Sequence, residues 1–267
     1  MQKIFKGKIP AYQFHGLQKF SDAVDHAVFS RQGGVGKPPF DSLNVSYSVD
    51  DKESAVTKNR KLIAQACGLE TGRIVSANQT HSANVRVMDS ENLQFYQPPQ
   101  EIDDTDAFLT NEPDIGLMIK VADCQAIFMF DPVQKVIAAV HAGWKGLVQD
   151  ISGETLKIMK KMFGVKPENV IAAISPSLGP CCAFFSDPAK ELPSDFKPYI
   201  KYNKCVDLWQ YSLDQLQSHG VNGENIELAR VCSFCGAGHK FYSFRRDRGV
   251  TGRFGAVIWL NESTSPA

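Results

Sequence analysis

Short apolar segments recur along the chain and predict the strands of a buried sheet. Each is bounded by polar or turn-forming residues, and several are apolar at every position rather than at alternate ones. Such continuous apolar runs indicate strands covered on both faces. The predicted strands occupy residues 84–89, 116–123, 135–140, 169–174, 226–231 and 255–260.

Helical spacing of apolar residues appears between these segments. From Leu147 to Phe163 the apolar side chains fall into two adjacent rows, and Gly164 follows as a stop signal. A second helix is predicted from Asp207, a suitable N-cap, to Gly220, and a third from about Glu53 to Cys67. Strands that alternate with helices predict the α/β class, with helices packed over the sheet.

The composition is that of an ordinary globular protein and predicts one domain. The chain has 267 residues, of which 43% are apolar and 22% are charged. Its loop-like stretches are rich in Gly, Pro, Asp or Ser, but none has the length and polarity of an interdomain linker. We therefore expect a single domain that covers residues 1–267.

Charge and hydropathy narrow the choice of partners and compartment. The formal net charge is zero, which gives no electrostatic reason for binding nucleic acid or a membrane. The chain shows neither a signal-peptide core nor an apolar run near the roughly 18 residues of a membrane-spanning helix. We expect a cytoplasmic protein, monomeric or homodimeric, whose seven cysteines are thiols, ligands or nucleophiles rather than disulfides.

Three residues could together form a metal site. His141 ends a predicted buried strand and is followed by the small residues Ala142 and Gly143, which would let a metal or substrate approach closely. Cys124, next to Asp123, interrupts another apolar segment, and His81 precedes a third. Each has an ordinary structural interpretation: a hydrogen-bonded core histidine, a small buried thiol, a loop histidine.

Two imidazoles and one thiolate are ligands suited to zinc or copper. Three protein ligands would leave a fourth position for water, as in catalytic zinc sites. The wide spacing of His81, Cys124 and His141 is unlike that of a zinc finger.

Around these residues the sequence resembles a known family. HAGWKG, preceded by NQTH and ADC and followed by SPSLGPCC and FYSFRRDRGVTGR, is similar to the laccase-domain family, also called multicopper polyphenol oxidoreductase-like or YfiH-type. The resemblance covers nearly the whole chain. It implies a single layered α-β-β-α domain with mixed sheets flanked by helices, and zinc bound by His81, Cys124 and His141.

The resemblance also implies activity on purine nucleosides. It implies phosphorolysis of adenosine, inosine and S-methyl-5′-thioadenosine with inorganic phosphate, deamination of adenosine, and a role in peptidoglycan precursor editing. Deamination would require a metal-activated water and a carboxylate that shuttles the proton. Asp123 is the candidate for that shuttle, or else for orienting a histidine.

Four cationic residues are candidates for binding phosphate. Arg60 falls within the apolar stripe of the predicted helix 53–67, so it requires either an internal carboxylate or a bound anion. Lys145 stands where the family usually has Arg, and it lacks the bidentate fork of Arg. Arg245 and Arg246 form a basic pair that could bind an anion or remain solvated.

Other functions remain open from the residues alone. A multicopper laccase needs on the order of ten histidines, whereas the chain has six, so at most one copper would bind at a His₂Cys site. Alternatively, Cys124 could be the nucleophile and His141 the base of a hydrolase, or the chain could be a binding module with a structural zinc.

A second cysteine-rich motif raises the possibility of a second metal. CSFCGAGH presents Cys232, Cys235 and His239, and Cys181 or Cys182 could supply a fourth ligand. The alternative is a set of paired thiols near a strand end.

Overall fold

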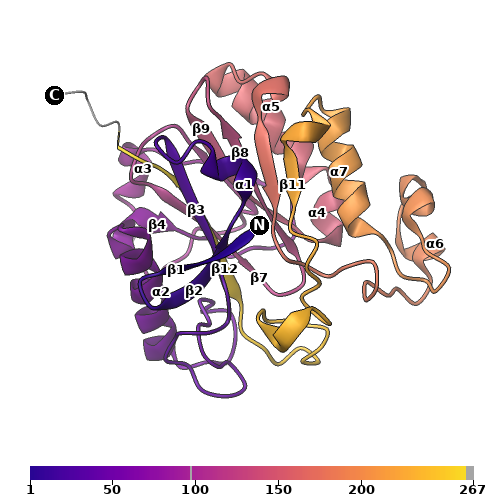
Figure 1. Ribbon diagram of the computed structural model, residues 1–267, viewed down its shortest axis with the longest axis horizontal. Coiled ribbons are helices and arrows are strands. Elements are labelled where there is room, and N and C mark those ends of the chain that lie inside the picture. Colours follow the sequence, from indigo (N-terminus) through magenta and orange to yellow (C-terminus); the bar gives the residue numbers. More distant parts are fainter. Residues whose placement is uncertain (97, 263–267) are drawn as a thin grey trace.

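The computed structural model describes residues 1–96 and 98–262 and contains two stacked six-stranded sheets (Figure 1). The first sheet is antiparallel except for its β4–β7 pair, and the second has parallel pairs only at its two edges. In spatial order, the first sheet contains β1 (Gln2–Lys6), β2 (Ile9–Gln13), β3 (Val24–Phe29), β12 (Phe254–Leu260), β7 (Gly116–Val121) and β4 (Ile74–Val75). The second contains β11 (Ile226–Leu228), β10 (Ile171–Ile174), β8 (Gln125–Asp131), β9 (Val136–Ala142), β6 (Ala107–Thr110) and β5 (Val85–Val87).

Helices cover the outer faces of the two sheets. One lies against the first sheet, and two lie against the second on the opposite side of the molecule (Figure 1). These are α2 (Glu53–Cys67) on the first sheet, and α5 (Ile151–Phe163) and α7 (Leu208–Ser218) on the second. Shorter helices are α1 (His15–Gln18), α3 (Ser90–Leu93), α4 (Trp144–Val148) and α6 (Pro188–Glu191). The expected layered α/β fold with mixed sheets flanked by helices is confirmed.

Alternation along the strands explains how the layers adhere. On β8, Phe128 and Phe130 point into the apolar layer between the sheets, whereas Ile127 and Met129 pack under α5 and its neighbours. Because both faces are buried, residues 126–130 of β8 are all apolar, as expected from the sequence. None of the helices in the described ranges is long and apolar enough to cross a membrane.

The predicted helix 147–163 is in fact two helices. Asp150 adopts a left-handed conformation with φ of 56°, which separates α4 from α5. Its carboxylate accepts a hydrogen bond from the Gly153 backbone N–H at 3.2 Å and so caps the N-terminus of α5. Helix α7 begins after its expected N-cap, Asp207, and α2 has the predicted bounds.

Candidate active site

A cavity of about 480 Å³ lies where the two sheets and their connecting loops meet. Its size is within the range of small-molecule binding sites. Its wall is made partly of polar and charged side chains and partly of aromatic and aliphatic ones. The polar part includes His81, Lys120, Asp123, Cys124, His141, Arg245 and Arg253, and the apolar part includes Trp144, Leu178, Phe185, Leu208 and Phe244.

Cys124 lies in the turn that carries the chain from one sheet to the other. Strand β7 belongs to the first sheet and β8 to the second, and only residues 122–124 connect them. Asp123 has φ of 89°, a rare conformation that this abrupt reversal requires. The single interrupted strand expected here is therefore two strands in different layers, and the interruption delivers the Cys124 thiol to the cavity.

His141 is held in place by Asp106 through both backbone and side chain. The Asp106 carbonyl accepts the His141 backbone N–H at 2.7 Å, and Oδ1 lies 2.7 Å from His141 Nδ1. Both residues are buried. With Nδ1 donating to the carboxylate, Nε2 is the ring nitrogen left with a lone pair to bind a metal.

The same carboxylate organises the loop that carries His81. Asp106 Oδ1 accepts the His81 backbone N–H at 3.1 Å, and Oδ2 accepts the Ser82 backbone N–H and hydroxyl, each at 2.7 Å. Burial alone would raise the pKa of Asp106, but the hydrogen bonds from His141 and Ser82 hold that pKa well below its usual range. A permanently ionised Asp106 thus positions two of the three candidate ligands.

The three candidate ligand atoms converge closely enough to share a metal. They all lie within 4.8 Å of one another, and His81 Nε2 is 3.7 Å from Cys124 Sγ. Tetrahedral coordination with bonds of roughly 2.0 Å to nitrogen and 2.3 Å to sulfur would separate such atoms by about 3.3–3.5 Å. The residues present therefore fit a metal with one open position.

Gly143 is required beside these ligands for steric reasons. A Cβ atom at this position would lie 2.8 Å from His81 Cδ2 and 3.0 Å from Cys124 Sγ. Either contact would displace a ligand side chain. The small residues after His141 thus give clearance to the ligands themselves as well as to whatever binds them.

Without a metal, Cys124 and His141 favour an ion pair. Burial would raise the pKa of the Cys124 thiol, but attraction and hydrogen bonding to His141, with a further hydrogen bond to His81, lower it to about 6. Burial would likewise lower the pKa of His141, yet the Cys124 thiolate and Asp106 raise it to about 9. A thiolate ready to bind a metal or to act as a nucleophile is therefore present at neutral pH.

Comparison with a family model and with known relatives identifies the family of this chain. A model described as "Multi-copper polyphenol oxidoreductase laccase" matches residues 25–261. The chain belongs to this laccase family. It is 32% identical over 246 residues to a protein named purine nucleoside phosphorylase YlmD from Bacillus subtilis, which covers 88% of this chain and 87% of that protein. It is 30% identical to a purine nucleoside phosphorylase from Bacteroides thetaiotaomicron, over 93% and 96% of the two chains.

Solved structures share the fold of this laccase-family chain. The crystal structure of the Bacillus licheniformis hypothetical protein YfiH has a TM-score of 0.86 and 26% identity, covering 97% of this chain and 99% of that one. YlmD from Geobacillus stearothermophilus has a TM-score of 0.81 at 26% identity, covering 90% and 92%. The "multi-copper" description finds limited support in the site, since among the described residues only the group around Cys124 combines histidines with a thiol.

The other candidates from the sequence fall into two groups. Asp123 and Arg245 line the cavity, and the two are joined, since Asp123 Oδ2 accepts the Arg245 backbone N–H at 2.7 Å. Asp123 Oδ1 accepts the Ser233 hydroxyl at 2.6 Å. The Asp123 carboxylate thus ties together two loops of the wall.

Arg60, Lys145 and Arg246 lie outside the residues that line this cavity. Arg60 Nη2 forms a buried ion pair with Glu101 at 2.6 Å, which is the internal-carboxylate alternative expected from its helix position. Lys145 is exposed on α4, and Arg246 pairs with the adjacent Asp247 at 2.8 Å. Lys145 therefore is not part of the cavity wall.

Sequence reasoning missed Asp106, Lys120 and Arg253. Asp106 stands in the segment DDTDAF, whose acidic residues resemble a polar turn, and Lys120 stands within an apolar strand. The lysine within that strand was a usable signal, because a buried ammonium needs a partner. Glu101 is that partner, bonded to both Lys120 and Arg60.

Replacing Asp106 tests its control of the ligands. Asp106→Asn should reduce metal affinity roughly 10–100-fold, because the histidine loses the carboxylate that fixes its tautomer and orientation. Competition with a chromophoric chelator would measure the affinity. Asp103→Asn, which removes an exposed carboxylate charge in the same segment, is the matched control and should bind normally. Unchanged affinity in a folded Asp106→Asn variant would contradict this role.

The ionisation of Cys124 can be measured by alkylation of metal-free protein. Because the pKa is lowered to about 6, the iodoacetamide reaction at this site should approach its plateau near pH 7. In the urea-unfolded chain the same thiol should follow an ordinary pKa of about 8.5. Peptide mass spectrometry would report the site-specific rates, and a rate still rising steeply above pH 8 in the folded protein would refute the ion pair.

Proposed function

We propose that this chain is a zinc-dependent purine nucleoside phosphorylase. The observation that supports this most is the union, in one ligand-sized cavity, of an open metal site, cationic side chains and an aromatic wall. Relatives that align over most of the chain carry the name purine nucleoside phosphorylase. The proposed substrates are adenosine, inosine and S-methyl-5′-thioadenosine, with inorganic phosphate as co-substrate.

The aromatic wall suits the flat face of a purine. Trp144 and Phe185 meet edge to face, with ring centroids 6.1 Å apart, and so present a fixed apolar corner. Phe244 lines the cavity and is 51% exposed, so its ring is accessible to a ligand. We assign these three side chains to packing against the base and its ribose.

Arg253 is the strongest candidate for binding phosphate. It lines the cavity and is half-buried. Its Nη1 donates to the carbonyls of Thr251 and Gly252 at 3.0 and 3.1 Å, while Nε and Nη2 have no acceptor within the described ranges. A guanidinium held by one nitrogen can offer the others to an oxyanion.

Lys120 adds to the same wall a positive charge whose pKa is lowered. Burial lowers the pKa of its ammonium to about 8, with attraction to Glu101 offsetting only part of the desolvation. Glu101 also bonds Arg60, so the carboxylate is shared between two cations. We propose that this sharing leaves a net positive charge beside the cavity that attracts phosphate.

In phosphorolysis, the bond between C1′ and the purine nitrogen breaks, and a phosphate oxygen forms the new bond to C1′. The purine leaves with a proton in place of the sugar. The chain would hold phosphate with Arg253 and Lys120 and would orient the nucleoside against the aromatic wall. Zinc bound by His81, Cys124 and His141 would supply Lewis-acid polarisation at the site.

Adenosine deamination finds less support in this geometry. The reaction needs a carboxylate free to move a proton. Among the described residues that line the cavity, Asp123 is the sole carboxylate, and both of its oxygens already accept hydrogen bonds from Ser233 and Arg245. We therefore propose that phosphorolysis is the main reaction and that Asp123 positions the Arg245 loop.

A thiol hydrolase is the second candidate. The Cys124 thiolate, the His141 imidazolium and the Asp106 carboxylate follow each other in hydrogen-bonded order, as in cysteine-dependent enzymes. A bound metal would block the nucleophile. The two functions therefore differ in whether removing the metal abolishes or unmasks activity.

Product analysis with and without phosphate tests the main proposal. Metal-loaded protein should convert inosine to hypoxanthine and ribose 1-phosphate only when phosphate is present. Chelation should abolish turnover and zinc should restore it. Free ribose would indicate hydrolysis, inosine formed from adenosine would indicate deamination, and activity that persists in metal-free protein would favour the thiol hydrolase.

Replacing Arg253 tests the phosphate assignment. Arg253→Gln should raise the KM for phosphate about tenfold or more, since a charge-assisted hydrogen bond contributes roughly 1.5–3 kcal/mol. Zinc content should be unchanged. Lys145→Gln, which removes an exposed charge outside the cavity, should leave the KM within about twofold of wild type. A normal KM in Arg253→Gln would refute the assignment.

A further inference from the structure

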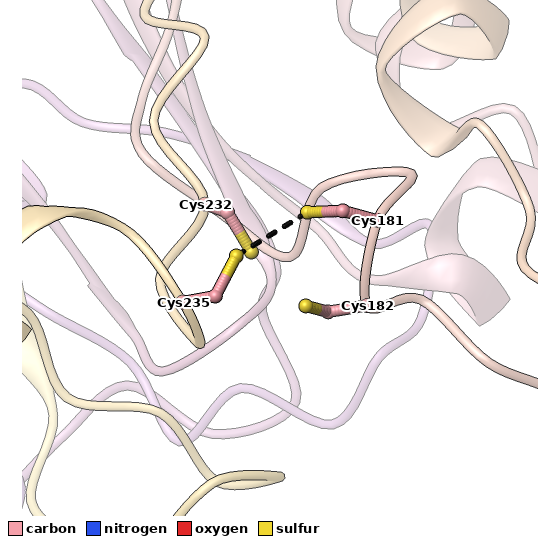
Figure 2. Close-up of side chains that lie close together, drawn as sticks. All are labelled: Cys181, Cys182, Cys232 and Cys235. Carbon is pink, nitrogen blue, oxygen red and sulfur yellow. Dashed lines mark hydrogen bonds between the residues drawn. The ribbon is translucent and has the colours of Figure 1, made fainter.

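Four cysteines from two loops that are far apart in the sequence lie close together beside the cavity. Cys181 and Cys182 lie in the loop that follows β10, and Cys232 and Cys235 lie in the loop that follows β11. Figure 2 shows the four side chains pointing toward a common centre. The group consists of thiols alone, so both cysteines of the first pair participate and His239, considered from the sequence, does not.

The spacing of the sulfurs matches a tetrahedral metal site. All four Sγ atoms lie within 4.8 Å of one another, and those of Cys181 and Cys235 are 3.4 Å apart (Figure 2). Four sulfurs at roughly 2.3 Å from a shared zinc would be separated by about 3.8 Å. A disulfide would instead require two sulfurs at about 2.05 Å.

The backbone prepares Cys232 to act as a thiolate. The Gly179 backbone N–H donates to Cys232 Sγ at 3.3 Å, which stabilises negative charge on the sulfur. A Cβ atom at Gly179 would lie 2.9 Å from the Trp209 ring and 3.2 Å from Cys232 Cβ. Only glycine therefore allows this loop to approach the thiol so closely.

The two loops are joined by the backbone around the thiols. Ser177 donates its backbone N–H to the Val231 carbonyl at 3.2 Å, and the Ser177 carbonyl accepts the Ser233 N–H at 2.9 Å. Gly236 donates to the Cys232 carbonyl at 2.7 Å and closes the turn of the Cys-x-x-Cys segment. These bonds fix the relative positions of both cysteine pairs, so little ordering would remain to be done when a metal binds.

We propose that Cys181, Cys182, Cys232 and Cys235 bind a Zn²⁺ ion in a closed tetrahedral site, separate from the open site at Cys124. Four thiolates are a donor set that selects zinc among the abundant divalent cations. All four positions are filled by protein, so the ion has no place for substrate. Its role is to hold the two loops together.

Those loops carry part of the cavity wall. The Arg245 guanidinium donates to the Cys182 carbonyl at 3.0 Å, and Ser233, between the two cysteines of its loop, donates to Asp123. Leu178 and Phe185 flank the first cysteine pair and line the cavity. A zinc at the four thiols would thus fix the wall that faces the substrate, without touching the substrate.

Metal counting in a variant that lacks the open site provides the test. His81→Ala/His141→Ala should retain about one zinc per chain, against about two in wild type. Adding Cys182→Ser/Cys235→Ser should remove that remaining zinc. Cys205→Ala is the matched control, because Cys205 is a buried thiol outside the group, and it should retain the zinc. Circular dichroism and thermal unfolding would report whether each variant folds.

If the cysteine variants fail to fold, the absorption spectrum of bound Co²⁺ tests the site without them. Co²⁺ bound to the folded His81→Ala/His141→Ala protein should give the intense tetrahedral and thiolate charge-transfer bands of a four-sulfur site. Absence of these bands and of zinc would overturn the proposal. A Cys181–Cys235 disulfide in anaerobically purified protein would also overturn it. Zinc that persists in the folded variant with all four substitutions would do the same. These outcomes do not depend on whether the chain cleaves nucleosides.

Discussion

The buried carboxylate of Asp106 is the interaction on which the candidate active site depends. The carboxylate contacts the His141 ring and accepts backbone N–H groups of the His81 loop. The backbone carbonyl of Asp106 also accepts the His141 N–H. A fully buried carboxylate is costly unless it is saturated with donors, and here every donor belongs to the site. The hydrogen bonds that keep this carboxylate ionised are therefore the same ones that position the ligands.

The candidate active site also depends on the short connection that takes the chain from the first sheet to the second. Residues 122–124 leave one sheet and enter the other, and Gln125 pairs with Ala142 as β8 begins. That register brings Cys124 opposite Gly143, where a larger residue would collide with the thiol. The cavity lies at this crossing, and Ala122, Asp123 and Cys124 form part of its wall.

Much of this was predictable from the sequence, and two of the contacts that were missed share one cause. The apolar runs, the cap at Asp207 and the helix 53–67 are local signals, and they predicted an α/β fold with helices over a buried sheet. The arrangement in two sheets was implied by the family resemblance. The ligand trio was found because its residue types suit one metal. Asp106, by contrast, acquires its role from His141, which lies far along the chain, and the partner of Arg60 is the similarly remote Glu101. The break at Asp150 escaped detection because apolar periodicity continues through it.

The need of Arg60 for an anion was inferred correctly from the sequence, but that anion is a carboxylate of the chain. Its position on the inner face of α2 required an anion, and phosphate was one candidate. The anion present is Glu101, which also pairs with Lys120 at the cavity wall. One carboxylate lies between two cations, so the group carries a net positive charge whenever Lys120 is protonated. Arg60 itself is not among the residues that line the cavity, and Glu101 connects it to Lys120, which is.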